Sequence, residues 1–528
     1  MRQFYQSRRY APVWVNDSGP RAAADRVAEA LAGSREHGLR SEDYGIARIR
    51  SLLDEARRDL LKVKAPAEAT QLAELELALT RGYLKYAEDL SRGRLRPRDS
   101  RSDARLEVPA ALDAAVRGEP PATALAQLAP RHAGYEKLRD LLALYREVEA
   151  DGGWDPLPAN LKVIPGTRGP QVIALRERLA VTGDLERTAT EAPTFDPNLE
   201  RAIRRFQARH GLSGTGRIGA ADVAALNVPV QERIRQIEVN LERWRWLPEN
   251  LGSTNVAVNI PDYTLAVNEG GNPVLGMKVV VGDEYSPTPV LSDELTYIVF
   301  GPSWSIPVSI TKEEILPKVK EDPGYLAAHD MRAYAGEGGD ARDVTDEIDW
   351  GSVDPENLEF TLRQAPGPRN PLGRIKFICP NRFNVYLHDT PAEHLFAQRE
   401  RTFSHGCIRV EKPAELAAFL LRDQSEWTVE RIQKEMETAK EKTVTLSRPV
   451  PVHIFYWTAW VDDAGLLQFR DDPYGSDREV AAALDGAPRS AHASAPASRT
   501  AQALPTQALA KPVHAAPGVE LVAVDAAR

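Results

Sequence analysis

The sequence predicts a multi-domain α+β protein in which helical domains come first and a mostly β, sandwich-like domain follows. Over roughly the first half of the chain, apolar residues recur at spacings of three and four, the period of a helix that buries one face. From residue 255 onward the spacing changes to two, the period of a half-buried strand. The length of 528 residues also allows several domains.

Composition excludes some classes of function. A hydrophobic fraction of 42% supports packed cores, and a net charge of -9 provides no dominant basic field, so nucleic acid is not expected as a partner. Two cysteines are too few for a disulfide scaffold. The sequence contains no apolar run of about 18 residues, so no transmembrane helix is predicted. Residues 1–7 lack the apolar stretch of a secretion signal, and we expect the true start to lie upstream of Met1.

Residues 1–150 are predicted to form a helical scaffold domain. Their periodicity predicts helices over 22–31, 47–61, 68–90 and 138–148. Gly93 and Pro97 end the third of these helices. No candidate catalytic residue stands out in this part of the chain.

Residues 155–228 are predicted to form a small three-helix module. Its helices are expected over 170–181, from Pro197 with Asp196 as the cap, and over 220–226. This pattern, with Phe206-Gln207 and Gly211-Leu212, resembles the type 1 peptidoglycan-binding domain. A spacer bundle without a ligand is the alternative.

Residues 229–250 are predicted to form a linker with a helix over 230–246. A buried stripe is expected on one face, and the charged residues between its members are expected to be solvated. The stripe consists of Ile234, Ile237, Leu241 and Trp244, and the charged face of Arg235, Glu238, Glu242 and Arg243.

Residues 254–480 are predicted to form the β domain. Its alternating pattern is interrupted at about 311–370 by an insertion with a short helix, which we interpret as a lid. A hairpin turn is expected at Gly270-Gly271, and a late strand over 452–460. Residues 486–528 are rich in Ala, Pro and Ser and are predicted to be disordered.

The chemistry is predicted to centre on Ser404-His405-Gly406-Cys407-Ile408-Arg409. A thiol reacts as the thiolate, and a neighbouring cation such as Arg409 lowers its pKa. Residues 382–388 alternate like a strand, which places Asn384, Tyr386 and His388 on the face away from the core. A cysteine and a histidine presented together are typical of an acyl-transfer site.

The order of these residues resembles the L,D-transpeptidase catalytic domain. That family has a histidine followed, at the spacing found here, by Ser/Thr-His-Gly-Cys, a hydrophobic residue and Arg or Asn. Residues 369–377 and 386–391 are similar to those of the large, multi-domain L,D-transpeptidases of Gram-negative bacteria. Those proteins also have a helical scaffold, a peptidoglycan-binding module and a capping insertion.

The resemblance implies catalytic roles. Cys407 is the expected nucleophile, His388 the general base, and the backbone carbonyl of Asp389 the group that orients the His388 ring. The amides of Gly406 and Cys407 fit an oxyanion hole.

Substrate contacts are expected from the same turn and from aromatic residues of the cleft. Tyr386 and Trp304 match cleft aromatics, and Ser404 and His405 are further candidates. Arg409 is expected either to hold Cys407 as thiolate or to bind a substrate carboxylate. His405 is expected to be structural rather than catalytic, because one base suffices.

By resemblance, the activity is two-step transfer through a thioester on a tetrapeptide stem, with release of D-Ala and formation of a 3→3 cross-link. Carbapenems are expected to acylate the same sulfur, and no cofactor is needed. Peptidoglycan stem peptides and the cell wall are the expected partners of a monomer located in the periplasm.

Three alternatives remain open. His388, His394, His405 and Cys407 are types of residue that bind zinc, although their spacing is irregular. A Cys-dependent L,D-carboxypeptidase would use the same nucleophile and base with water as the acceptor. A non-catalytic cell-wall-binding protein would leave these residues vestigial. The second cysteine, Cys379, is expected to be a buried core thiol, with a disulfide to Cys407 as the alternative.

Overall fold

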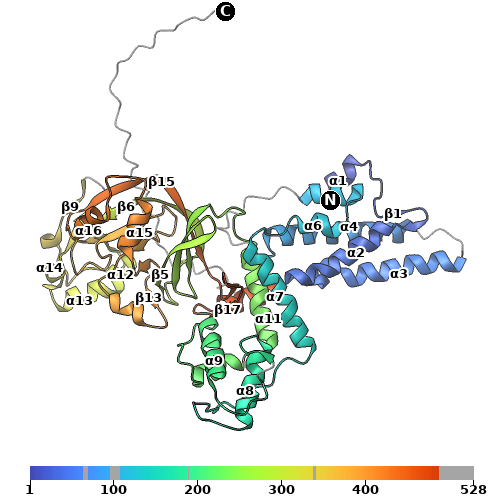
Figure 1. Cartoon of the computed structure of the whole chain (residues 1–528). Coiled ribbons are helices and arrows are strands. Elements are labelled where there is room, and N and C mark those ends of the chain that lie inside the picture. Colours follow the sequence, from blue (N-terminus) through green and yellow to red (C-terminus); the bar gives the residue numbers. More distant parts are fainter. Residues whose placement is uncertain (64–68, 96–107, 188–189, 337–339, 487–528) are drawn as a thin grey trace, which may run out of the picture. The chain divides into compact units, whose positions relative to one another are not determined.

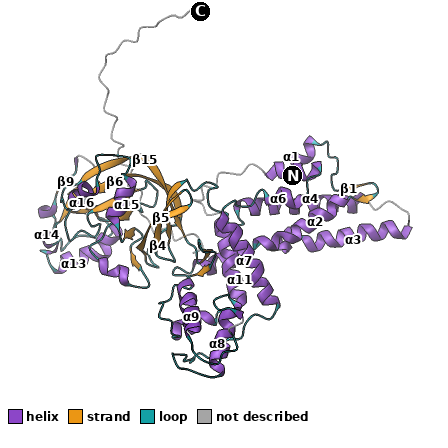
Figure 2. Ribbon diagram, in the orientation of Figure 1, coloured by secondary structure: helices purple, strands orange, loops and turns teal. Residues whose placement is uncertain are grey.

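The computed structural model describes residues 1–63, 69–95, 108–187, 190–336 and 340–486 (Figure 1). By its contacts the chain divides into two compact units. Among the described residues, one unit contains Met1–Pro302 and those from Pro371 to residue 486, and the other contains Ser303–Asn370. Helices dominate the N-terminal half and strands the C-terminal half, as Figure 2 shows by its colours, so the predicted α+β class is confirmed. Within the described residues, no helix is long and apolar enough to span a membrane.

The N-terminal region is a helical domain. The helices predicted there begin and end close to the expected residues, except that α7 begins earlier, and α1, α5 and α6 were not predicted. They are α1 (Arg2–Ser7), α2 (Ala22–Ala32), α3 (Ile46–Val63), α4 (Ala69–Arg92), α5 (Val108–Arg117), α6 (Pro121–Ala126) and α7 (Ala133–Ala150), with a short β1 (Val15–Asn16) and β2 (Gly19–Pro20) pair. Buried Glu76 accepts hydrogen bonds from the amides of Val13 and Trp14 and from the Tyr5 hydroxyl, which fixes the N-terminal segment against α4.

The three-helix module has its own core. It consists of α8 (Pro170–Val181), α9 (Pro197–Arg209) and α10 (Ala220–Leu226), bounds that agree with the sequence prediction. Asp196 caps α9 as predicted, because its Oδ1 accepts from the Leu199 amide at 2.8 Å. The Gln207 side chain holds the loop that follows: it donates to Asp222 and accepts from the Gly216 amide.

Helix α11 (Val230–Trp244) belongs to the core of the helical domain. Its predicted apolar stripe is confirmed as buried in that core. The expectation of a solvated charged face is wrong for two of its members. Glu242 is fully buried and pairs with Arg245 at 2.9 Å, and Arg243 is 4% exposed and pairs with Asp477 at 2.5 Å.

The β domain is one mixed sheet in the order β13-β5-β14-β12-β11-β6-β15-β3-β4. An additional pairing of β4 with β5 closes the sheet on itself, so the sandwich-like domain has opposing walls around one core. Helices α15 (Pro413–Leu420) and α16 (Val429–Met436) contribute to that core. The strands are β3 (Thr254–Asn259), β4 (Thr264–Glu269), β5 (Asn272–Gly282), β6 (Leu291–Phe300), β11 (Ile375–Ile378), β12 (Leu387–His388), β13 (Thr402–Ser404), β14 (Ile408–Val410) and β15 (Lys442–Phe455).

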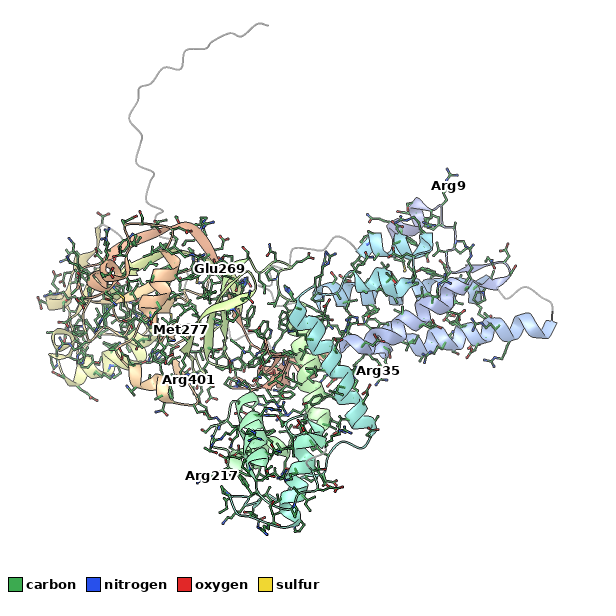
Figure 3. All side chains as sticks on the ribbon, in the orientation of Figure 1. Arg9, Arg35, Arg217, Glu269, Met277 and Arg401 are labelled. Atoms are coloured by element: carbon green, nitrogen blue, oxygen red, sulfur yellow. The ribbon has the colours of Figure 1, made fainter. Side chains whose placement is uncertain are left out.

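The segment that leads into β13 is fastened to the sheet by Arg401, one of the residues labelled in Figure 3. Its buried guanidinium donates to the backbone carbonyl oxygens of Val279 and Tyr263, both at 3.0 Å. These bonds hold the entry to the cysteine turn against β5.

The C-terminal segment joins the helical core, although the sequence assigns it to the β domain. Strands β16 (Ala459–Val461) and β17 (Leu467–Phe469) form a hairpin, and α17 (Ser476–Leu484) follows. Ala459, Leu467 and Phe469 are buried with the scaffold helices. The pattern of the sequence gives no sign of this, because the partners lie far away in the chain.

The insertion, Ser303–Asn370, is a folded unit rather than a long loop. Its four-stranded antiparallel sheet has the order β7-β10-β8-β9 and surrounds a separate core that includes Ile306, Val319 and Leu362. The elements are β7 (Trp304–Ser305), α12 (Val308–Ile310), a π-helical stretch (Thr311–Ile315), α13 (Leu316–Glu321), α14 (Tyr325–Ala328), β8 (Met331–Ala335), β9 (Arg342–Asp343) and β10 (Thr361–Gln364). Only the short helix was expected from the sequence. The predicted disordered tail lies outside the described residues from 487 onward.

Candidate active site

Three neighbouring strands present the candidate site on one face. In β11, β12 and β14, Lys376 pairs with His388, and His388 pairs with Arg409. Directly paired residues of a sheet share a face, and the next residues along each strand take the opposite face. The opposite face consists of Phe377, Leu387 and Ile408, which are fully buried in the core. The apolar residues of these short strands therefore fix which way the polar ones point.

The turn between β13 and β14 is held by Ser404. Its hydroxyl donates to the carbonyl oxygen of Cys407 at 2.5 Å and accepts from the Gly406 amide at 3.2 Å. Gly406 has φ of +106°, a backbone conformation that residues with a Cβ rarely adopt. Thr288 adds a third bond, from its Oγ1 to the Gly406 carbonyl oxygen at 2.8 Å. The turn that carries Cys407 is thus fixed before any substrate arrives.

Cys407 is half-buried, and its sulfur lies against the 381–386 loop. Sγ is 3.8 Å from the Asn384 carbonyl oxygen, and a hydrogen bond links it to the Tyr386 side chain. Burial raises the pKa of the thiol above its ordinary value, while Tyr386, Arg409 and Lys376 act to lower it. Stabilisation of a thiolate is one of the two roles that the sequence led us to expect for Arg409. Its effect has the expected sign, but burial outweighs it.

His388 is buried and held in one orientation. Its Nδ1 lies 2.5 Å from the backbone oxygen of Asp389, so Nδ1 carries the proton and Nε2 keeps its lone pair. Burial, together with the charges of Arg409 and Lys376, lowers the pKa of His388 to about 3. At neutral pH the imidazole is therefore uncharged, as a general base must be.

Tyr386 lies close to both of these groups. Its ring centroid is 5.8 Å from that of His388, and its side chain hydrogen-bonds the Cys407 thiol. The raised pKa of Cys407 and the lowered pKa of His388 both favour a neutral thiol–imidazole pair at rest. A charged pair would form only when the thiol gives up its proton.

The segment before His388 is a loop, so the predicted strand over 382–388 is wrong except for Leu387–His388. Asn384 has φ of +53°, which interrupts an extended chain. The Asn381 side chain organises the loop by donating to the Val385 carbonyl oxygen at 2.7 Å and accepting from the Phe383 amide at 3.0 Å. Asn384 consequently turns its carbonyl group, and not its side chain, toward the sulfur.

The hydrogen bonds of Ser404 change which amides are available for the predicted oxyanion hole. The Gly406 amide already donates to Ser404 and is not free to receive an oxyanion at rest. In the part of the chain that the structure describes, the Cys407 amide has no such partner. Ser404 itself is 3% exposed with both hydrogen-bonding directions used inside the turn, which favours a structural role over substrate contact. His405 is exposed.

Two sequence predictions concern residues elsewhere. Trp304 lies in the second compact unit, and its place in the cleft stays a prediction. Cys379 is buried, and its Sγ lies 3.6 Å from the Val385 carbonyl oxygen. Burial raises its pKa to about 11, and both cysteines are free thiols.

Within the described residues, no three His, Cys, Asp or Glu side chains gather as a metal site would require, and His388, His394, His405 and Cys407 form no such group.

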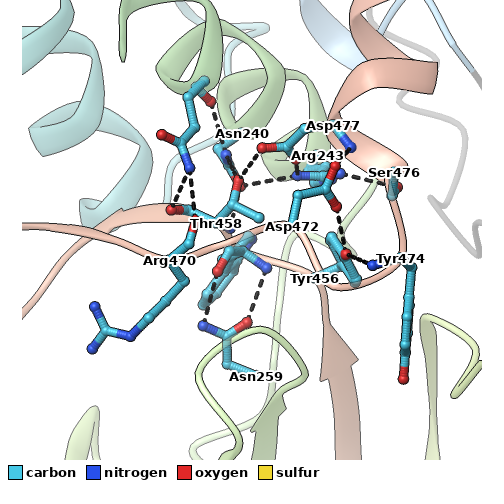
Figure 4. A network of polar contacts seen from close by, with 12 residues as sticks. Asn240, Arg243, Asn259, Tyr456, Thr458, Arg470, Asp472, Tyr474, Ser476 and Asp477 are labelled. Atoms are coloured by element: carbon cyan, nitrogen blue, oxygen red, sulfur yellow. Dashed lines mark hydrogen bonds and ion pairs between the residues drawn. The ribbon is translucent and has the colours of Figure 1, made fainter. Parts of the chain in front are cut away.

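Sequence reasoning missed a hydrogen-bonded path from α11 to the cysteine turn (Figure 4). Arg243 pairs with Asp477, whose amide donates to Asp472 at 2.8 Å. Tyr456 donates to Asp472 at 2.5 Å and accepts from the Tyr474 amide at 2.9 Å. These residues share no motif, so no local signal could have indicated the path.

Tyr474 completes this path. Its hydroxyl donates to the Gly282 carbonyl oxygen at 2.6 Å and accepts from the Thr288 amide at 3.3 Å. Thr288 in turn holds the Gly282 amide and the Gly406 carbonyl group. Lys376 was also missed as a site residue, although its position in an alternating strand could have indicated it.

Three stretches of the chain match family models. Residues 1–142 match a scaffold domain, residues 168–226 a putative peptidoglycan-binding domain, and residues 253–452 the L,D-transpeptidase catalytic domain. The chain thus combines regions that match a scaffold domain, a putative peptidoglycan-binding domain and an L,D-transpeptidase catalytic domain. This agrees with the resemblance found in the sequence.

A putative L,D-transpeptidase of Haemophilus influenzae is 34% identical over 248 residues, which cover 47% of this chain and 49% of the relative. The match thus spans about half the length of that curated relative. Among solved structures, an L,D-transpeptidase from Stackebrandtia nassauensis is 13% identical, covers 56% of this chain and 94% of that chain, and has a TM-score of 0.22. Another from Mycobacterium smegmatis is 14% identical, with 38% and 58% covered and a TM-score of 0.20. Structural similarity at these TM-scores carries no argument about the activity of this chain.

Proposed function

We propose that the chain is a peptidoglycan L,D-transpeptidase that forms 3→3 cross-links through a thioester on Cys407. One observation carries the proposal: a thiol and a neutral histidine lie beside the same tyrosine, and the histidine is held by a backbone carbonyl so that its lone pair is free. The match of residues 253–452 to the catalytic domain supports the same chemistry.

In the proposed acylation, Cys407 attacks the carbonyl carbon of the third residue of a tetrapeptide stem. His388 Nε2 takes the thiol proton as the sulfur–carbon bond forms, and the Cys407 amide faces the oxygen that becomes negative. His388 then returns the proton to the nitrogen of the breaking amide bond. D-Ala leaves, and the acyl group remains on sulfur as a thioester.

In the second step, an amine from another stem attacks the thioester. His388 accepts the proton of the amine, the new amide forms, and Cys407 leaves with a proton as a thiol. Water in place of the amine would give the L,D-carboxypeptidase, which remains the alternative because it uses the same acyl-enzyme. The two differ only in the acceptor.

A non-catalytic cell-wall-binding protein is the other alternative, and the match of residues 168–226 to a peptidoglycan-binding domain supports wall binding in either case. We further propose that the protein is a monomer that acts in the periplasm and that carbapenems acylate Cys407. These proposals follow from the cell-wall substrate and from the resemblance of the sequence.

The test is intact-protein mass spectrometry after incubation with a disaccharide-tetrapeptide. The wild-type protein should gain the acyl group with loss of D-Ala, and Cys407→Ala should gain nothing. Cys379→Ala is the matched control and should acylate like the wild type, because Cys379 is a buried thiol with a raised pKa. Adding an acceptor stem should then give the cross-linked dimer, whereas release of tripeptide alone would favour the carboxypeptidase. Binding to sacculi without any adduct would favour the wall-binding protein.

A further inference from the structure

Two basic side chains on the active-site face take no part in the steps above. Lys376 in β11 and Arg409 in β14 flank His388 at the same register position, one on each side. The charges of both act on the Cys407 thiol and on the His388 ring. The attacking sulfur therefore lies within electrostatic reach of two cations.

Both cations are partly buried, and neither is bonded to a protein anion among the described residues. Arg409 Nε is buried and has no hydrogen-bond partner, and burial lowers the pKa of Arg409. Burial also lowers the pKa of Lys376, whose Nζ lies 5.7 Å from the Tyr386 ring centroid. Glu441 is the acidic group whose charge acts on Lys376.

Within the described residues, neither cation forms an ion pair or a hydrogen bond with another side chain. A buried charge that lacks such a partner is unfavourable, so its presence calls for an explanation. A ligand that supplies the missing negative charge would provide one.

We propose that Lys376 and Arg409 form a subsite for the free carboxylate at the C-terminus of the donor peptide. The inference rests on the proposed function and names the part of the substrate that the site recognises. A guanidinium presents paired N–H donors that match the two oxygens of a carboxylate, and an ammonium adds a compact positive charge.

The position of the cations selects this carboxylate among those of a stem peptide. Because both cations act on Cys407 itself, their ligand must lie close to the carbonyl that Cys407 attacks. In a tetrapeptide, only the amide nitrogen and one Cα separate that carbonyl from the terminal carboxylate. A carboxylate at the end of the third side chain lies much farther away along the chain.

The subsite also favours the reaction. A carboxylate beside the forming thiolate would repel it, and two adjacent cations offset that repulsion. The subsite empties when the free D-amino acid leaves. A donor whose chain continued by one more residue would lack the carboxylate at this position, so the subsite selects tetrapeptides.

The first experiment needs no variant. Wild-type protein is incubated with a disaccharide-tetrapeptide that ends in a carboxylate and with the same donor ending in a carboxamide, and the rate of Cys407 acylation is followed by intact mass. The carboxylate donor should react about tenfold to hundredfold faster, the range expected for hydrogen bonds to a charged group. Equal rates would overturn the subsite and leave the proposed function standing. No adduct with either donor would remove both.

The second experiment locates the preference. Lys376→Met should reduce the carboxylate preference, the ratio of the carboxylate rate to the carboxamide rate, about tenfold, while Lys376→Arg should restore much of that ratio. Lys434→Met, at an exposed position of α16, is the matched control and should behave like the wild type. Alkylation of Cys407 by neutral iodoacetamide reports thiol reactivity separately from binding. If Lys376→Met slowed both donors equally, Lys376 would act on the thiol alone and the subsite would be wrong.

Discussion

Buried cations occur in two regions of this molecule, and the regions treat them differently. In the helical core, Arg245 is fully buried and pairs with buried Glu242, and it also donates to the Tyr135 hydroxyl at 3.1 Å. On the active-site face, Lys376 and Arg409 lack such partners among the described residues. The Nε atoms of Arg245 and Arg409 are both buried without a hydrogen-bond partner, so the two regions differ in the carboxylate that pairs with the cation. A cation paired with a carboxylate belongs to the fold, whereas we propose that the cations without one bind a ligand.

Buried histidines repeat this comparison. His37 in the scaffold and His388 in the site both have a pKa lowered to about 3, mainly by burial. The Nδ1 atom of His37 lies 2.9 Å from the hydroxyl oxygen of Tyr135. His388 uses its Nδ1 for the Asp389 backbone and keeps Nε2 on the side of the site. The same electrostatic state thus serves packing in one region and, in the proposed mechanism, proton transfer in the other.

The largest expected effect distinguishes these two histidines. His388→Gln should reduce the rate of Cys407 acylation by about 10²–10⁴-fold, the usual contribution of a general base, and His37→Gln should leave that rate nearly unchanged. Acylation rates from intact mass provide the measurement. Similar losses in both variants would show that His388 acts through folding and not through proton transfer.

The same pair makes a prediction about acid stability. Each folded-state pKa lies below the ordinary value of 6.5, so each histidine contributes stability that is present above pH 6.5 and is lost as the pH falls toward 3. The loss is of the order of 5 kcal/mol per group, at about 1.36 kcal/mol per pKa unit. In either Gln variant, the free energy of unfolding measured in urea should fall less steeply between pH 6 and 4 than it does in the wild type. The reason is that one buried histidine no longer has to be protonated in this pH range.

Arg245→Met should produce the next largest effect, on stability alone. The substitution leaves Glu242 buried without its cation, and breaking a buried pair in this way costs about 3–5 kcal/mol. Glu242 also accepts from the Leu95 amide at 2.7 Å, so it cannot easily move to solvent. Urea unfolding measures the loss. Arg48→Met, which removes an exposed ion pair with Glu74, is the control and should change the midpoint little. A small effect of Arg245→Met would mean that the stability of the helical core does not depend on its buried ion pair.

Sequence reasoning succeeded where the signal is local. The bounds of α8 and α10 and the Asp196 cap follow from apolar period and capping chemistry within one segment. The prediction that Cys407 and His388 act together came from a motif, and it stays a prediction. Sequence reasoning failed where the deciding partner is distant: Glu242 and Arg243 were expected to be solvated, yet Arg243 pairs with Asp477, far along the chain. The positive φ of Asn384 likewise depends on the loop that Asn381 organises. The alternating pattern of residues 382–388 gives no sign of that loop.

Tyr474→Phe tests the path that joins the two regions. The substitution removes the hydroxyl that donates to Gly282 and leaves that carbonyl unsatisfied, at about 1–3 kcal/mol. Thr288 forms hydrogen bonds with both Gly282 and Gly406, so the cysteine turn should become less ordered. The rate of Cys407 acylation should then fall by about tenfold. Tyr285→Phe, at a tyrosine 86% exposed, is the control. If the stability fell while the acylation rate held, the path would serve the fold only.

The smallest expected effect is also the most direct test of the comparison. Lys376→Met replaces an unpaired buried ammonium with an apolar side chain of similar length, so the penalty of burying the charge disappears with it. The free energy of unfolding, measured in urea without substrate, should change by less than about 1 kcal/mol or rise slightly. This is the opposite of Arg245→Met, although both substitutions remove a buried cation. Should Lys376→Met destabilise the protein as strongly as Arg245→Met does, Lys376 would have to be paired within the fold. The distinction between structural and ligand-binding cations would then fail at this position.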